Sequence, residues 1–179
     1  MREYTCDAAT DAGMWALWIP NHFAQIIDYD SWEEMLLEDD DIRQHIREGK
    51  FVPIYIRSDG CFGFCIRIDE RGGASLTCRE QSFLVVSSEN YLFVSEGEIY
   101  FSGIEHIGMP IDDRVIRIPL PAGRYQATIH MLDWKAEPGS QSGDGRPTAN
   151  ALPDFLIIIN PEKMFEAPYR MEVLTFDPI

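Results

Sequence analysis

The chain is poor in basic residues and in long apolar runs, and each shortage excludes a class of function. It holds 15 Lys and Arg side chains against 30 Asp and Glu, a formal net charge of −15. Such a protein repels the phosphates of nucleic acids and anionic membrane surfaces, so neither is an expected partner. Purely apolar runs, such as residues 155–159, are far too short to cross a membrane. A basic macromolecule is therefore the physical complement of this chain.

Cysteine is also scarce, at four residues. The first residues lack the basic flank and apolar stretch of a secretory signal, so we expect a reducing, cytoplasmic location and free thiols. Cys61 and Cys65 lie in a predicted strand, where four residues span about 13 Å, well beyond disulfide reach. A Cys-x3-Cys pair without a second clustered pair is a poor zinc site. We therefore expect neither a metal nor a cofactor.

Recognisable catalytic motifs are missing. The chain has no Gly-x-Ser-x-Gly elbow, phosphate-binding Gly-rich loop, dinucleotide fingerprint or His-Glu-x-x-His. We therefore predict a non-catalytic binding protein rather than an enzyme. An enzyme that uses His130 as an acid–base group is one alternative, because His130 lies on the polar side of a predicted strand. Glu105 and His106 are not expected to form a dyad, since adjacent strand residues point to opposite faces.

Acidic residues are concentrated near the N-terminus, where residues 1–50 hold 12 acidic and 4 basic side chains, a net charge of −8. Ser31 and Glu34 have the spacing of a capping box, and apolar residues follow at helical spacing until Gly49. This pattern predicts one helix over about 31–48. If the apolar stripe is buried, the other side presents an anionic face for a partner. An alternative is that these charges only keep the protein soluble. The face consists of Glu33, Glu34, Glu38, Asp39, Asp40 and Asp41.

Most of the chain after residue 50 alternates apolar and polar residues between turns. We predict a single domain over 1–179 of mainly β (α+β) class, an antiparallel β-sandwich or open barrel with one helix near the N-terminus. Residues 155–159 are apolar on both sides, which is typical of a central strand. Tyr125 follows a Pro/Gly corner, where its phenol can bind the backbone. The other predicted strands are a hairpin of 52–57 with 62–68, a hairpin of 91–94 with 99–102, and single strands at 76–87, 114–119, 124–134 and 169–176.

A second site is suggested by the predicted flexible loop over about 135–152, which is rich in Gly and Pro. Trp134 ends the preceding strand beside Asp133 and opens this loop. Aromatic and polar residues at a loop mouth are typical of ligand sites. The alternative function is thus a small-molecule-binding β-domain with a pocket near His130, Asp133 and Trp134.

Three segments resemble a known family: residues 91–104, residues 114–129 with their Leu-Pro-Ala-Gly-Arg-Tyr corner, and the strand that begins at Pro153. They are similar to the core of the bacterial competence-nuclease inhibitor family, and to uncharacterised immunity-like β-sandwich domains. The resemblance implies a small acidic protein that inhibits a nuclease by direct binding. It assigns no inhibitory residue to this chain, so the six acidic residues of the predicted helix remain candidates on charge density alone.

Overall fold

The computed structural model describes residues 1–163 and 168–177 and consists mainly of β-strands. Eight strands form one sheet in the order β1-β4-β8-β7-β6-β2-β3, with β5 paired to β7. The predicted mainly β class is confirmed. The sheet is mixed, because β4 and β8 run parallel while the other pairs are antiparallel. The strands are β1 (Arg2–Thr10), β2 (Met14–Trp18), β3 (Phe51–Tyr55), β4 (Gly60–Ile68), β5 (Leu84–Ser87), β6 (Tyr91–Gly103), β7 (Ile116–Leu132) and β8 (Phe155–Pro161).

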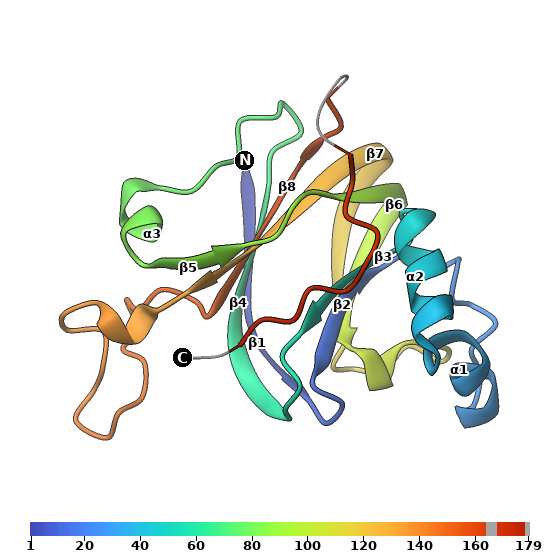
Figure 1. Cartoon of the computed structure of the whole chain (residues 1–179), viewed down its shortest axis with the longest axis horizontal. Helices are drawn as coiled ribbons and strands as arrows, with labels where there is room; N and C mark the ends of the chain where they lie inside the picture. Colours follow the sequence, from blue (N-terminus) through green and yellow to red (C-terminus); the bar gives the residue numbers. More distant parts are fainter. Residues whose placement is uncertain (164–167, 178–179) are drawn as a thin grey trace.

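Short helices lie at two opposite ends of the molecule (Figure 1). One end carries α1 and α2, and the other carries α3 and the connection between β7 and β8. Among the described residues, no helix is long and apolar enough to cross a membrane. The helices are α1 (Tyr29–Leu36), α2 (Asp39–Arg47), α3 (Cys78–Ser82) and the 3₁₀ helices η1 (Ile104–His106) and η2 (Trp134–Ala136).

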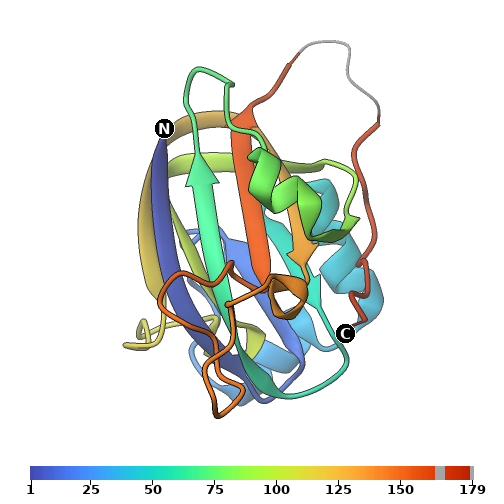
Figure 2. The same ribbon diagram turned by 90° about the vertical axis from the view of Figure 1, so that its left-hand side faces the viewer.

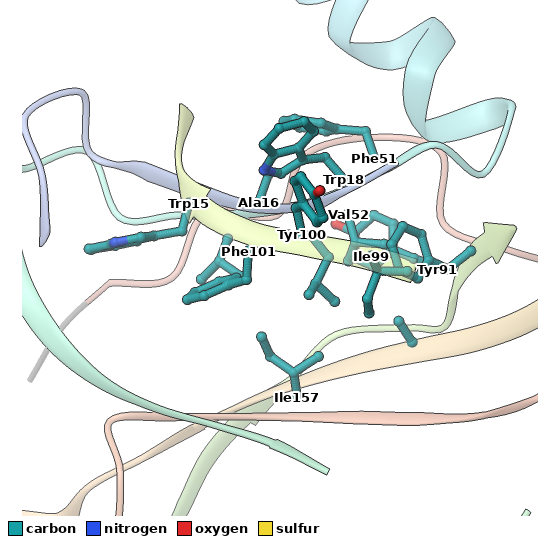
Figure 3. Packing of buried hydrophobic residues seen from close by; sticks show 14 of the residues in the cluster. Trp15, Ala16, Trp18, Phe51, Val52, Tyr91, Ile99, Tyr100, Phe101 and Ile157 are labelled. Carbon is teal, nitrogen blue, oxygen red and sulfur yellow. The ribbon is translucent and has the colours of Figure 1, made fainter. Parts of the chain in front are cut away.

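The sheet curls around one hydrophobic core, as in an open barrel. Trp15 of β2 packs against Phe62 and Phe64 of β4, with ring centroids 5.4 and 5.2 Å apart. Three strands separate β2 from β4 in the sheet order, so this contact requires the sheet to fold back on itself. Ile157 of β8 lies across the same core from Phe101 of β6 (Figure 3).

β8 is covered on both faces, as the apolar run predicted. Phe155, Ile157 and Ile159 belong to the main core. Leu156 and Ile158 point to the other face and join a smaller cluster with Trp134 and Leu152. α3 and the β7–β8 connection lie over this second face (Figure 2). A strand buried on two faces needs no polar alternation, which explains its sequence.

The predicted helix over 31–48 is wrong in its continuity and its start. The structure has two helices, α1 and α2, joined at Leu37 and Glu38. Leu36 and Ile42 are both buried but six residues apart, which in one continuous helix places them about 120° apart around the axis. The break allows both to face the core. The N-cap of α1 is Asp28, whose side chain accepts from the backbone N–H of Ser31, so Ser31 is the third helical residue and not the cap.

Both predicted hairpins are wrong. β3 pairs with β2, and β4 pairs with β1 and β8, so these consecutive strands do not pair with each other. Residues 91–103 form a single strand, β6, that passes through Glu96 and Gly97 with an irregular register against β7. The strand predicted at 76–87 contains α3 before β5. Residues 169–176 contain only an isolated bridge between Thr175 and Tyr55.

The predicted corner at Tyr125 is confirmed, although the strands on either side form one long strand, β7. The Tyr125 hydroxyl donates to the carbonyl oxygen of Pro121 at 2.9 Å. Tyr125, Ala127, Ile129 and Met131 all face the main core, as the alternation predicted. A phenol that binds the backbone four residues upstream ties down the bend that a Pro/Gly corner starts.

Candidate functional site

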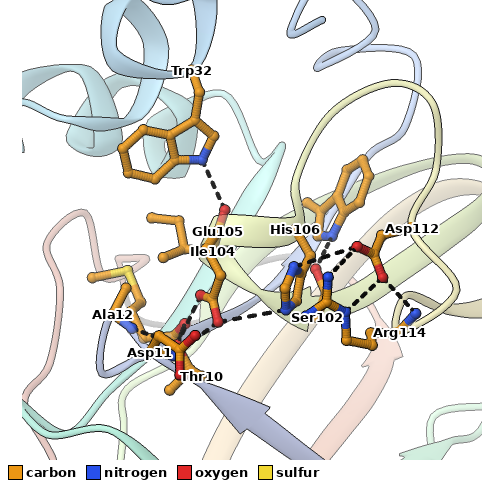
Figure 4. A network of polar contacts seen from close by, with 12 residues as sticks. Thr10, Asp11, Ala12, Trp32, Ser102, Ile104, Glu105, His106, Asp112 and Arg114 are labelled. Atoms are coloured by element: carbon orange, nitrogen blue, oxygen red, sulfur yellow. Dashed lines mark hydrogen bonds and ion pairs between the residues drawn. The ribbon is translucent and has the colours of Figure 1, made fainter. Parts of the chain in front are cut away.

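The helices α1 and α2 are held to the sheet by one apolar side. Leu36, Ile42 and Ile46 are buried in the main core. The Trp32 indole donates to the carbonyl oxygen of Ile104 at 2.9 Å, which fixes α1 beside η1 (Figure 4). The opposite side of both helices therefore faces solvent.

The six acidic residues predicted as a partner-binding face lie around the junction of α1 and α2. Glu34, Glu38, Asp39 and Asp40 are exposed, whereas Glu33 and Asp41 are partly buried. The three aspartates occupy the first turn of α2, where negative charge interacts favourably with the helix dipole. Asp40 also pairs with Arg43 at 2.6 Å. These carboxylates thus have a structural role in starting α2 as well as an exposed position.

Large apolar side chains are also exposed along α1, from just before its first residue to its C-terminal end. Ile27, Tyr29 and Leu37 are 68%, 67% and 53% exposed. Tyr29 stacks on Trp32 with the ring planes 11° apart, so its ring is held in place while still open to solvent. Protein interfaces commonly combine exposed apolar side chains with polar ones. We call these three residues and the six acidic residues the α1–α2 surface.

A pocket of about 350 Å³ opens next to this surface, between the start of α1 and η1. Tyr29 and Trp32 line one side, and His106 with two carboxylates lines the other. His106 Nε2 lies 3.6 Å from Glu105 and its Nδ1 lies 3.7 Å from Asp112 (Figure 4). The prediction that Glu105 and His106 point apart is wrong, because they lie in a 3₁₀ turn and not in a strand.

Both carboxylates are anchored. Glu105 accepts from the Thr10 hydroxyl and the Asp11 backbone N–H, each at 2.9 Å. Arg114 binds Asp112 with two nitrogens, at 2.8 and 2.6 Å, and holds the pKa of that carboxyl well below its usual range. An aromatic wall facing fixed carboxylates favours a cationic group over an anionic one. Asp112 was not among the residues predicted from the sequence, although the acidic pair at 112–113 after a Gly- and Pro-containing turn was a usable signal.

Asp133 and Trp134, the predicted ligand residues of the loop mouth, lie side by side at η2. Asp133 accepts from the backbone N–H of Ala136, and the buried Trp134 indole donates to Asp154 at 2.8 Å. Both line a cavity of about 40 Å³. Trp134 also borders a wider groove of about 1120 Å³ that reaches across to Asp7 and the loop at Arg146.

His130 lines neither the cavity nor the groove. Its ring Nδ1 is 2.7 Å from the Ser87 hydroxyl, and burial lowers the pKa of His130 to about 4. The structure thus brings Asp133 and Trp134 together but places His130 in a different environment. The small-molecule and enzyme alternatives remain predictions.

Solved structures confirm the resemblance at the level of the fold. The chain is similar to "Crocagin biosynthetic gene J", with a TM-score of 0.57 and 18% identity, over 91% of this chain and 100% of that one. It is also similar to ComJ from Bacillus subtilis, described as an inhibitor of the DNA-degrading activity of NucA. That match has a TM-score of 0.50 and 13% identity, over 90% of this chain and 98% of ComJ. No family model and no curated protein sequence match the chain.

These two matches cover more of the chain than the three segments that carried the resemblance in the sequence. The likeness to ComJ and to crocagin protein J extends over nine tenths of the chain, so it includes strands that the sequence segments did not cover. At these identities the likeness concerns the fold.

Proposed function

We propose that this protein is a non-catalytic, acidic binding protein that blocks a basic partner such as a nuclease through the α1–α2 surface. The observation that carries the proposal is that exposed carboxylates and exposed large apolar side chains occur together on and beside α1 and at the start of α2. Nuclease sites attract phosphate, so an anionic protein surface can occupy them with fast, salt-sensitive association.

Three further observations support the proposal. The net charge of −15 produces a long-range attraction to a basic partner. The fold is similar to that of ComJ, an inhibitor of the DNA-degrading activity of NucA. The pocket at His106 lies beside the α1–α2 surface and suits a lysine or arginine side chain of the same partner.

Capture from a lysate of the source organism tests this proposal. The immobilised chain is loaded at low salt and eluted with a salt step, beside an Asp39→Asn, Asp40→Asn, Asp41→Asn variant. We expect one basic protein on the wild type and a strong loss on the variant. The captured protein is then assayed for DNA degradation with increasing amounts of the chain, which should suppress it.

A matched control separates local from global charge. A variant with Asp7→Asn, Asp11→Asn and Asp59→Asn removes three exposed carboxylates that lie outside the helices. We expect this control to capture nearly as much partner as the wild type. Equal capture by all three proteins, or capture of no basic protein, would contradict the proposal.

A further inference from the structure

Three potential metal ligands meet where the loop before α1 packs on the end of α2. His22 Nε2 lies 2.9 Å from His45 Nδ1 and 3.9 Å from a carboxylate oxygen of Glu48. The three ligand atoms all lie within 4.8 Å of one another. His45 and Glu48 are three residues apart at the end of α2, so they face the same side of the helix, and the loop supplies His22.

The second nitrogen of His45 settles which atom faces the cluster as a ligand. Its Nε2 lies 3.0 Å from the carbonyl oxygen of Met35, and a carbonyl can only accept, so Nε2 carries the hydrogen. In the neutral ring Nδ1 is then unprotonated and aimed at His22. Metal-binding histidines commonly donate a hydrogen bond from the N–H of their other ring nitrogen to a carbonyl oxygen in this way.

The surroundings also favour a cation. The cluster lies at the C-terminal end of α2, where the helix dipole is negative. Phe23 forms edge contacts with both imidazoles, at 4.8 and 4.9 Å, and provides an apolar wall. The nearby Lys50 ammonium is neutralised by Glu96 at 2.7 Å.

We propose that His22, His45 and Glu48 form a binding site for a divalent transition-metal ion, with Zn²⁺ as the best match to two imidazoles and one carboxylate. Tetrahedral Zn²⁺ places its ligand atoms about 3.3 Å apart. The two nitrogens must therefore separate slightly, and the half-exposed Glu48 must swing inward. Water completes the coordination. In the absence of metal, the hydrogen on His22 Nε2 lies between the two rings. When the ion occupies that position, this hydrogen is carried on Nδ1 of His22 instead.

A bound ion would join the loop at His22 to α2, and so would fix the position of the α1–α2 surface. This effect differs from partner binding, because it depends on neither Asp39 nor its neighbours. Loss of the metal site and loss of the proposed function can therefore be told apart with separate variants.

Titration of the tag-free chain with Zn²⁺ tests the site, with calorimetry for stoichiometry and histidine ring NMR signals for location. We expect one ion per chain, shifts of the His22 and His45 signals, and a higher melting temperature with Zn²⁺. His22→Gln and Glu48→Gln should each weaken binding about tenfold or more. Glu48→Gln changes a half-exposed side chain, so it tests the site even if His22→Gln disturbs the fold.

His106→Gln is the matched control, because His106 is a histidine beside carboxylates at another place in the molecule. It should bind Zn²⁺ as the wild type does. The proposal would be overturned by a wild type that binds no Zn²⁺, by unchanged binding in Glu48→Gln, or by loss of binding in His106→Gln.

Discussion

His130 shows how burial turns one side chain into a determinant of stability against acid. Its imidazole is 8% exposed and bonded to Ser87, and burial lowers its pKa to about 4, against about 6.5 in an unfolded chain. Between these two values the unfolded state binds the proton and the folded state does not. Stability is therefore lost as the pH falls from about 6.5 toward 4.

The corresponding prediction concerns His130→Gln. The wild type should lose up to about 3 kcal/mol of unfolding free energy across this pH window because of His130. The variant should show a flatter dependence. Urea unfolding at pH 7 and pH 5 measures the difference, and comparison with the wild type removes the contribution of His22, which has the same sign. Parallel pH profiles for the two proteins would contradict this account.

Arg67 and Glu80 form a buried ion pair on the outer face of the sheet. Their side chains are 6% and 8% exposed, and two hydrogen bonds join them at 2.9 and 2.6 Å. Although burial acts in the opposite direction, bonding to Arg67 and Thr77 lowers the pKa of Glu80. Arg67 has one further carboxylate partner, Glu3.

Glu80→Gln should lower the unfolding free energy by about 2–4 kcal/mol, because among the described residues it leaves the buried Arg67 with Glu3 alone as a charged partner. Urea unfolding at neutral pH measures this loss. Glu70→Gln is the control, since its pair with Arg2 is 49% and 40% exposed and should cost less than about 1 kcal/mol. Equal losses of unfolding free energy in the two variants would show that burial of the Arg67–Glu80 pair adds nothing to its contribution to stability.

At the scale of elements, the bend in β7 depends on one phenol. Tyr125→Phe keeps the buried ring and removes only the hydrogen bond to Pro121, so we expect a loss of about 1 kcal/mol in unfolding free energy. Tyr100→Phe is a suitable control, because its hydroxyl makes a longer 3.4 Å contact with Glu98. A loss no larger than that of the control would mean that the corner is held by packing alone.

Sequence patterns correctly predicted the elements that depend only on residues close together in the sequence. The doubly apolar strand β8 and the Tyr125 corner follow from the order of side chains alone, and both are present. The division of α1 from α2 depends on two buried positions, Leu36 and Ile42, that must reach the same core. The predicted apolar stripe consisted of Met35, Ile42 and Ile46 with Leu36 beside it, which did not require a break.

Strand pairing depends on contacts that are distant in sequence, and there the prediction failed. β3 follows α2 but pairs with β2, while β4 pairs with the N-terminal β1, for which no strand had been predicted. A turn between two alternating segments does not require that they pair, because each strand can bury its apolar side against another neighbour. The candidate pocket was missed for the same reason, since its walls come from α1 and from the segment after β6.

At the scale of the whole molecule, the proposed function rests on the net charge of −15 and on where the acidic side chains lie. Six acidic side chains could be named from the sequence, but the exposed Ile27, Tyr29 and Leu37 beside them required the structure. The aspartates also favour the start of α2 through the helix dipole, so their removal affects stability as well as binding. A test of function must therefore measure affinity on folded variants.

The most direct test is calorimetric affinity for the captured basic partner, at low and at physiological salt, with the wild type and the Asp39→Asn, Asp40→Asn, Asp41→Asn variant. Circular dichroism first confirms that the variant is folded. We predict that the variant loses about tenfold or more in affinity at low salt, equivalent to about 1.4 kcal/mol, and depends less steeply on salt. An unchanged affinity and salt dependence in the folded variant would contradict the central claim that the α1–α2 surface holds the partner.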